Sequence, residues 1–265
     1  MNAGKLPDHI SYSQLAVYLQ CPLKYRFHYI DGLEPAFTAA SLAFGQAVHQ
    51  AVASFFQGAL EGEYLSADNM IDVYREAWRG CEGPPIQYSN GDTEKKLLKK
   101  AADILTLWHS RQDPTIEVYG VEEQFSVDLC QKADSPGNGL PALVGYVDHI
   151  LKMPDGNITL IDLKTAARKP SPLQVDQTLQ LTAYSLGAEV LGFDPDELTL
   201  RMDYLIKSAT PDLVRYETSR SEEDRRKFVK LLTRVWKAIE TSIFYPKPDW
   251  YCKSSCGYQS QCAEW

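Results

Sequence analysis

Two aspartates and a lysine stand close together in the central part of the chain. Asp148 lies in one apolar run, Asp162 and Lys164 lie in the next, and a Pro-Asp-Gly-Asn turn signal at 154–157 separates the runs. This pattern predicts a hairpin. Because side chains alternate along a strand, Asp162 and Lys164 are expected on one face and Leu163 on the other. The sequence therefore predicts two carboxylates and an amine beside one hairpin.

These three groups suit a divalent cation and a phosphate substrate. An unpaired carboxylate among apolar side chains is costly, and aspartate oxygens are the ligands that Mg²⁺ and Mn²⁺ prefer. Lys164 would then orient or deprotonate an attacking water, or stabilise charge on phosphorus. The alternative is a structural Asp–Lys ion pair on an exposed face.

The composition is that of a globular protein, since 44% of the 265 residues are apolar and 23% are charged. We expect one domain spanning 1–265. No apolar run approaches the roughly 18 residues of a membrane span, and the N-terminus lacks the apolar core of a signal peptide. We therefore expect a cytoplasmic protein with no membrane partner. The net charge of −8 argues against indiscriminate nucleic-acid binding but leaves room for a local basic groove.

Helices and strands are expected to position these groups. Helices are predicted over 11–29 (two short ones), 41–59, 68–80, 93–111, 173–191 and 221–243. Strands are predicted over 116–129, in both arms of the hairpin, and near 198–207 and 213–217, with a flexible loop at 133–139. The first three strands should be successive and antiparallel.

Two helices carry further polar groups. The helix over 41–59 contains Gly45-x3-His49 and is expected to direct Leu42, Val48, Val52 and Phe56 to the core. A glycine inside a helix costs about 1 kcal/mol relative to alanine, which predicts a close backbone approach at Gly45. A lone helical histidine is usually structural or solvated. The helix over 173–191 carries Gln180 and Tyr184 one turn apart on one face.

Two basic stripes are candidate tracks for phosphates. Lys95 with Lys99, and Lys96 with Lys100, are spaced i and i+4 on one helix, while Arg226, Lys230 and Arg234 follow one another at steps of four on another. The usual meaning of such a stripe is a solvated helix face.

Four of the six cysteines form a candidate metal site. Cys252, Cys256 and Cys262 have the spacing C-x3-C-x5-C in a tail with little expected regular structure, and Cys21 lies at a helix junction near the other end. Zn²⁺ and a [4Fe-4S] cluster both accept four thiolates, and the spacing does not separate them. Either would clamp the tail onto the N-terminal helices. Unliganded thiols are the alternative.

Taken together and in order, these motifs resemble the RecB-like branch of the PD-(D/E)XK nucleases. The resemblance rests on Gly45-x3-His49, Asp148, Asp162-Leu163-Lys164, Gln180-x3-Tyr184 and the split cysteine set, and it spans Ser11 to Cys262. It is closest to the iron-sulfur members, which include the AddB nuclease domain and small CRISPR-associated exonucleases. Two positions depart from it: Asp162 stands where many relatives carry Glu, and the first tail spacing is x3 where relatives often have x2.

The resemblance implies an α/β (α+β) fold with a restriction-endonuclease-like core, a mixed central sheet flanked by helices. It implies that His49, Asp148, Asp162 and the carbonyl of Leu163 hold Mg²⁺ or Mn²⁺, with Lys164 assisting hydrolysis. Gln180 and Tyr184 would line the DNA channel. Residues 11–30 and 245–265 would bind [4Fe-4S] through Cys21, Cys252, Cys256 and Cys262.

The expected function is a metal-dependent DNA exonuclease acting on single-stranded DNA or duplex ends. Such an enzyme would serve DNA repair, recombination, phage replication or spacer acquisition. No Gly-x4-Gly-Lys-Ser/Thr loop occurs in the sequence, so processivity would require a helicase, recombination or CRISPR partner, or a homo-oligomer. Two alternatives remain: an inactive nucleic-acid-binding module of the same fold, and an iron-sulfur redox or sensor protein.

Overall fold

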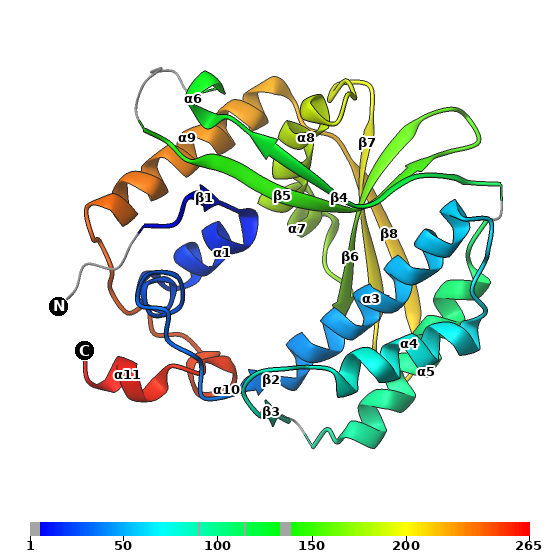
Figure 1. The fold of residues 1–265 in the computed structure, drawn as a ribbon, viewed down its shortest axis with the longest axis horizontal. Coiled ribbons are helices and arrows are strands. Elements are labelled where there is room, and N and C mark those ends of the chain that lie inside the picture. Colours follow the sequence, from blue (N-terminus) through cyan, green and yellow to red (C-terminus); the bar gives the residue numbers. More distant parts are fainter. Residues whose placement is uncertain (1–5, 90, 114, 133–138) are drawn as a thin grey trace.

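A sheet of six strands divides the molecule into two helical layers in the computed structural model, which describes residues 6–89, 91–113, 115–132 and 139–265 (Figure 1). The strands are β1 (His9–Ile10), β4 (Glu117–Val127), β5 (Ala142–Lys152), β6 (Ile158–Ala166), β7 (Thr199–Ile206) and β8 (Asp212–Thr218). β4–β5, β5–β6 and β7–β8 are antiparallel, whereas β1–β5 and β6–β7 are parallel. The predicted hairpin and mixed sheet are confirmed.

Helices cover both faces of the sheet. One layer contains α1 (Tyr12–Gln20), α8 (Leu179–Val190) and α9 (Glu222–Glu240), and the other contains α3 (Ala40–Leu60), α4 (Ala67–Arg79) and α5 (Glu94–Ser110). The short helices are α2 (Pro22–Tyr25), a π-helical turn (Arg26–Ile30), α6 (Leu129–Lys132), α7 (Pro172–Asp176), α10 (Cys252–Ser255) and α11 (Gln259–Ala263). A separate parallel pair joins β2 (Thr38–Ala39) to β3 (Ile86–Gln87).

The prediction of one helix over 173–191 is wrong in one respect, because the structure has two helices there, α7 and α8. The break after α7 leaves the carbonyls of Val175 and Thr178 facing the guanidinium of Arg220, whose Nη2 donates to each at 3.2 Å. Arg220 is buried and comes from the segment before α9. The Val175 carbonyl also accepts from the Thr178 amide at 3.1 Å, so Arg220 adds a tertiary donor to carbonyls at the break between the two helices.

Three smaller expectations are also corrected. Leu42 is exposed, although Val48, Val52 and Phe56 on the same helix are buried as predicted. A Cβ added at Gly45 would lie 3.5 Å from the Thr165 Oγ1, an ordinary contact, so no close backbone approach explains this glycine. The tail contains the two short helices α10 and α11. The loop expected at 133–139 lies, apart from its last residue, outside the described residues.

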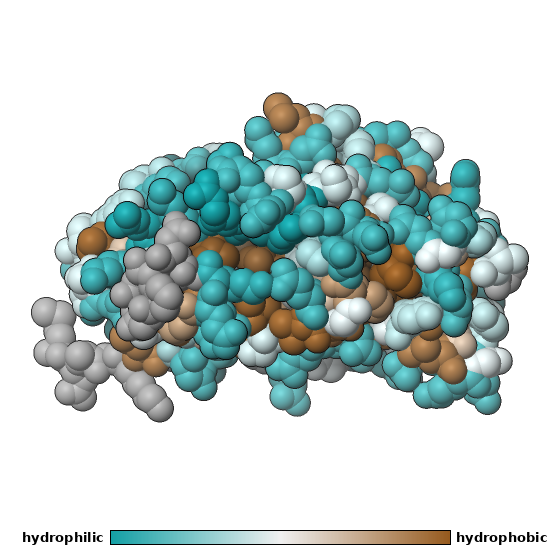
Figure 2. Space-filling model, turned by 90° about the horizontal axis from the view of Figure 1, so that it is seen from above, coloured by the Kyte–Doolittle hydropathy of each residue, from teal (hydrophilic) through white to brown (hydrophobic). Residues whose placement is uncertain are grey.

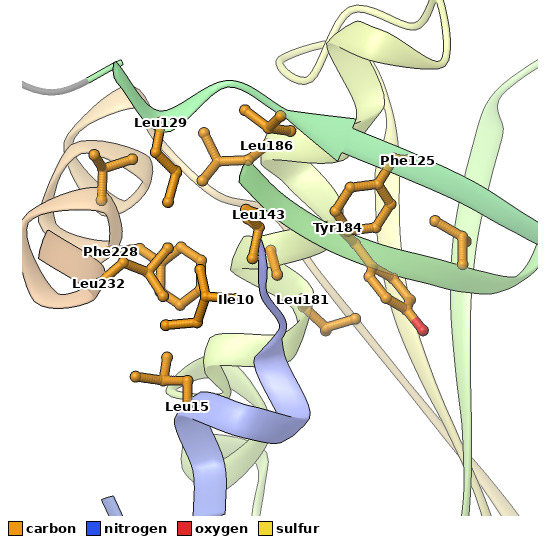
Figure 3. Close-up of a cluster of buried hydrophobic side chains, with 14 of the residues drawn as sticks. Ile10, Leu15, Phe125, Leu129, Leu143, Leu181, Tyr184, Leu186, Phe228 and Leu232 are labelled. Atoms are coloured by element: carbon orange, nitrogen blue, oxygen red, sulfur yellow. The ribbon is translucent and has the colours of Figure 1, made fainter. Parts of the chain in front are cut away.

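A hydrophobic cluster joins the sheet to α1, α8 and α9 (Figure 3). The ring of Phe125, on β4, fits against two glycines: a Cβ at Gly145 would come within 2.4 Å of it, and a Cβ at Gly187 within 2.6 Å. These glycines let α8 approach the sheet closely. Tyr184 on α8 belongs to this cluster, and Figure 3 shows its hydroxyl at the edge of the buried group.

The C-terminal tail packs against the N-terminal helices. The Tyr251 hydroxyl donates to the Gln20 carbonyl at 2.9 Å and so caps the end of α1, and the amide of Leu23 donates to the Tyr245 carbonyl at 3.1 Å. Farther along, the Ala36 amide donates to the Gly257 carbonyl at 2.8 Å. Protein contacts thus join the tail to the N-terminal segment.

Figure 2 shows the distribution of hydrophilic and apolar residues on one face of the molecule. Seen from above, hydrophilic residues cover most of the face and apolar residues form a narrow band between them (Figure 2). In the described part of the chain, no helix combines the length and the apolar character that crossing a membrane requires.

Candidate active site

The candidate active site lies where the neighbouring strands β5 and β6 stop pairing. β5 and β6 pair only from His149 opposite Ile161 to Lys152 opposite Ile158, and beyond His149 the two strands separate. The far end of β5 pairs on that side with the short strand β1. Backbone groups of β6 beyond Ile161 are therefore free to bind something other than β5, and Figure 1 shows the strands diverging there.

The place where β5 and β6 separate, called the fork below, brings the two predicted carboxylates together. Asp148 on β5 accepts a hydrogen bond from the Leu163 amide at 2.8 Å. Asp162 on β6 is fully buried and is approached by Lys164, whose Nζ donates to Oδ1 at 2.9 Å and lies 2.8 Å from Oδ2. Asp162 Oδ2 receives no aligned hydrogen bond from any described residue. A buried acceptor without a donor is costly, and a cation would complete its coordination.

The hydroxyl of Tyr184, on α8, contacts both carboxylates. Its hydroxyl lies 3.3 Å from Asp148 Oδ1 and 3.2 Å from Asp162 Oδ1, and is therefore shared between them. Burial raises the pKa of Tyr184 well above its usual value, and both aspartates add to this effect, while a hydrogen bond with Gln180 opposes it. Of the predicted pair, Tyr184 thus lies directly against the carboxylates, and Gln180 contacts Tyr184.

α3 brings His49 to the same place. Its Nδ1 lies 3.4 Å from Asp148 Oδ2. Burial lowers the pKa of His49 and the Lys164 ammonium lowers it further, which outweighs the opposite effects of Asp162 and of the Leu163 backbone and favours the neutral ring. A neutral imidazole has the lone pair that metal coordination requires.

Glu122 on β4 was not predicted as a site residue. In the described part of the chain, the only group of three or more histidine, cysteine and acidic side chains with ligand atoms within 4.8 Å of one another is His49, Glu122 and Asp148. Asp162 lies outside this group. No sequence signal distinguished Glu122 from Glu123, since both lie in a strand that reads Val-Glu-Glu-Gln-Phe.

The site carries more negative than positive charge. Burial raises the pKa of Asp148 well above its usual value, with Asp162 as the next cause, and burial also raises the pKa of Glu122. Burial alone would lower the pKa of Lys164, but Asp162 and Asp148 outweigh it. One lysine therefore faces three carboxylates, and a divalent cation would correct this imbalance.

The four cysteines of the predicted cluster line one cavity of about 300 Å³ between the N-terminal helices and the tail. Burial raises the pKa of Cys262, and the other three thiols raise it further in the order Cys21, Cys256, Cys252. All four thiols are therefore neighbours. The remaining cysteines, Cys81 and Cys130, do not line this cavity.

The comparisons with known proteins agree with this geometry. A family model described as the PD-(D/E)XK nuclease superfamily matches residues 9–263, nearly the whole chain. The chain belongs to the PD-(D/E)XK nuclease superfamily. No curated protein matches it.

Among solved structures, one described as "Putative exonuclease" from Eubacterium rectale is similar to this chain. It has 13% sequence identity and a TM-score of 0.55, with 97% of this chain and 88% of that chain covered. At this identity the likeness shows the fold. A second structure, SSO0001, has 12% identity and a TM-score of 0.35, with 95% of this chain and 96% of that chain covered.

PD-(D/E)XK nucleases use divalent metals, and the fork supplies suitable ligand atoms: the carboxylates of Asp148 and Asp162, and the imidazole of His49. The two basic stripes lie elsewhere. α5, with Lys95 to Lys100, packs on one face of the sheet, and α9, with Arg226 to Arg234, packs on the other (Figure 1). The stripes therefore do not form one continuous surface.

Proposed function

We propose that the chain is a metal-dependent deoxyribonuclease of the RecB-like branch that removes nucleotides from single-stranded DNA or duplex ends. The observation that carries this proposal is the pair Asp148 and Asp162, both within 3.3 Å of the Tyr184 hydroxyl, with Lys164 on Asp162. Two ionised buried carboxylates this close require compensating positive charge, since otherwise one of them takes up a proton. Lys164 supplies one positive charge, and a divalent cation would supply the rest.

Each residue has a role that follows from its position. Asp148, Asp162, His49 and the carbonyl of Leu163 would hold Mg²⁺ or Mn²⁺, whose Lewis acidity stabilises negative charge on a phosphate. Lys164, with its side chain partly exposed at the fork, would orient a water molecule toward the phosphate. Tyr184 fixes the two carboxylates, and Gln180, one turn earlier on α8, would contact the DNA.

The cysteine cavity supports a [4Fe-4S] cluster rather than one Zn²⁺ ion. In a tetrahedral zinc site the Zn–S bond is about 2.3 Å, so neighbouring sulfurs lie about 3.8 Å apart. Among the described residues, no three of the thiols Cys21, Cys252, Cys256 and Cys262 lie within 4.8 Å of one another. The wider spacing fits a larger metal centre.

Digestion of end-labelled DNA tests the nuclease. We expect the protein to shorten single-stranded DNA in Mn²⁺ and to be inactive in EDTA. Asp162→Asn should abolish cleavage, whereas Asp155→Asn, an exposed carboxylate in the turn of the same hairpin, should not. A protein that binds Mn²⁺ and DNA but cuts neither single strands nor duplex ends would be the inactive binding module of this fold.

The cluster has its own test. Anaerobically purified protein should show a broad visible absorption band and contain about four iron atoms per chain. Cys256→Ser should lose both, whereas Cys130→Ser should lose neither, because Cys130 lies outside the cavity and donates to the Leu140 carbonyl. A colourless protein with one zinc per chain would contradict the iron-sulfur proposal and leave the nuclease proposal intact.

A further inference from the structure

Another cavity, of about 230 Å³, lies between the sheet and the C-terminal ends of α3 and α5, and none of the site residues at the fork lines it. Its aromatic wall consists of Phe55 and Phe56 on α3, Tyr64 on the loop that follows, and His109 on α5. The Phe55 ring meets the rings of Tyr64 and His109 edge-on, with centroids 6.0 and 5.6 Å apart. Such a wall suits a planar apolar group.

Two arginines on neighbouring strands line the same cavity. Arg201 on β7 is buried, and its Nε and Nη2 donate to the two carboxylate oxygens of Asp203 at 2.8 and 3.2 Å. Arg215 on β8 lies opposite Asp203 in the register, and its Nε is 3.5 Å from Asp203 Oδ2. Among the residues that the structure describes, two guanidiniums therefore share one carboxylate, which leaves one positive charge in excess.

Two other carboxylates lie nearby but do not balance this charge. Asp113 lines the cavity, yet it is exposed and its Oδ1 accepts from the amide and the hydroxyl of Thr115 at 2.9 and 2.7 Å. Glu217 lies opposite Arg201 in the register, but it is exposed, does not line the cavity and forms no ion pair with a described residue. Arg201 Nη1 likewise has no hydrogen-bond partner in the described part of the chain. An unused donor on a buried side chain is costly, and a ligand acceptor would satisfy it.

We propose that this cavity binds a small aromatic carboxylate, a single planar ring that carries one negative charge. Guanidiniums pair with carboxylate oxygens, so Arg215 and the unused donor of Arg201 would hold the charged group. The ring would lie among Phe55, Phe56 and Tyr64. At about 30 Å³ per water molecule the cavity has room for roughly eight waters, which suits one ring rather than a larger ligand.

This binding site goes beyond the nuclease function and does not rest on it, although the two sites share structural elements. Phe56 lies on α3 with His49. Its ring packs on the ring of His149, with centroids 4.4 Å apart, and His149 follows Asp148 on β5. A ligand in the cavity would therefore contact the helix that carries one of the predicted metal ligands.

Calorimetric titration of the full-length protein with benzoate, in metal-free buffer without DNA, tests the proposal. We expect saturable binding of one benzoate per chain. Benzyl alcohol, which has the same ring without the charge, should bind at least about tenfold more weakly, and Arg215→Gln should weaken benzoate binding by a similar factor. The matched control is Arg75→Gln on α4, because Arg75 is another partly exposed arginine in contact with one carboxylate, that of Asp72. It should bind benzoate as the parent does.

A second variant fills the space without changing the charge. Ala59 lines the cavity from α3, so Ala59→Leu places apolar atoms in it and should abolish benzoate binding with an unchanged circular dichroism spectrum. If the parent does not bind benzoate, or if Ala59→Leu and Arg215→Gln bind it as tightly as the parent, the proposal is wrong. Thymidine 5′-monophosphate that binds more tightly than benzoate, and is weakened by the same two variants, would overturn the choice of a carboxylate. Since neither metal nor DNA is present, these results do not depend on whether the protein cleaves DNA.

Discussion

The Leu163 amide donates to Asp148 Oδ2 at 2.8 Å, across the fork between β6 and β5. This amide is available because β5 leaves β6 after His149, so the opening of the sheet both creates the site and orients its first carboxylate. The next side chain, Lys164, then reaches back to Asp162 on the same strand. One local feature of the sheet therefore positions three of the predicted site residues.

Removing Lys164 should affect folding as well as cleavage. Asp162 is fully buried, so Lys164→Met leaves a buried carboxylate without its cation and should lower the free energy of unfolding in EDTA by about 1–3 kcal/mol. Cleavage should fall by a factor of about 10²–10⁴. The double variant Asp162→Asn/Lys164→Met should regain stability but no activity, as urea unfolding and the DNA assay would report. Additive losses of stability would contradict a coupled pair.

Tyr184→Phe should destabilise the metal-free protein selectively. The ring stays in the core, but two buried carboxylates lose their shared donor, which costs about 1–3 kcal/mol. The loss should shrink in Mn²⁺, because a cation satisfies the same oxygens. Tyr25→Phe is the matched control: Tyr25 is fully buried and its hydroxyl has no partner among the described residues, so no loss is expected. Equal losses with and without Mn²⁺ would argue against a cation at these carboxylates.

Gly257→Ala should loosen the C-terminal tail. A Cβ at this position would lie 2.6 Å from Pro35 Cβ and 3.1 Å from the Ala36 amide nitrogen, so backbone must move. We expect a loss of about 1–3 kcal/mol and faster amide hydrogen exchange over 251–263. Ser254→Ala, an exposed change in the same tail, should have no effect. Unchanged exchange in Gly257→Ala would show that the tail does not pack as described.

The tail should also loosen in acid. His28 Nδ1 is 2.8 Å from the Tyr258 hydroxyl, which donates to the Leu33 carbonyl, so His28 is the donor in this contact. Burial lowers the pKa of His28, with Lys24 adding to the effect. The unfolded histidine takes up a proton near pH 6.5 and the folded one resists it, so the stabilisation is complete above pH 6.5 and declines below it.

Thermal unfolding measured between pH 7.5 and 5.5 checks this expectation. His28→Gln keeps a hydrogen-bond donor without a titrating group, so its melting temperature should fall less on acidification than that of the parent. A fall of equal size in both proteins would remove His28 as the cause.

Much of the local structure could be predicted because its causes are local. The turn residues at 154–157 and the flanking β-branched runs determine the β5–β6 hairpin. In the structure Ser11 and Ser221 cap α1 and α9 through side-chain hydrogen bonds to residues three positions later, and Pro22 opens α2, so these helix starts depend on neighbouring residues only. Strand alternation placed Asp162 and Lys164 on one side, where the structure has them in contact.

Contacts between distant segments could not be predicted in the same way. Arg220 ends α7 through carbonyls more than 40 residues earlier in the chain, and no propensity within 173–191 signals that break. The exposed face of α3 at Leu42 likewise depends on where neighbouring elements lie.

By itself, the sequence determined the types of the reactive groups and the strands and helices that carry them, because side-chain chemistry and periodicity act over a few residues. Only the tertiary structure decided that the sheet opens after His149 and that Tyr184 joins Asp148 to Asp162. It alone showed that Glu122, and not Glu123, lies with His49 and Asp148. These features arise from packing between segments far apart in the chain, which no local pattern encodes.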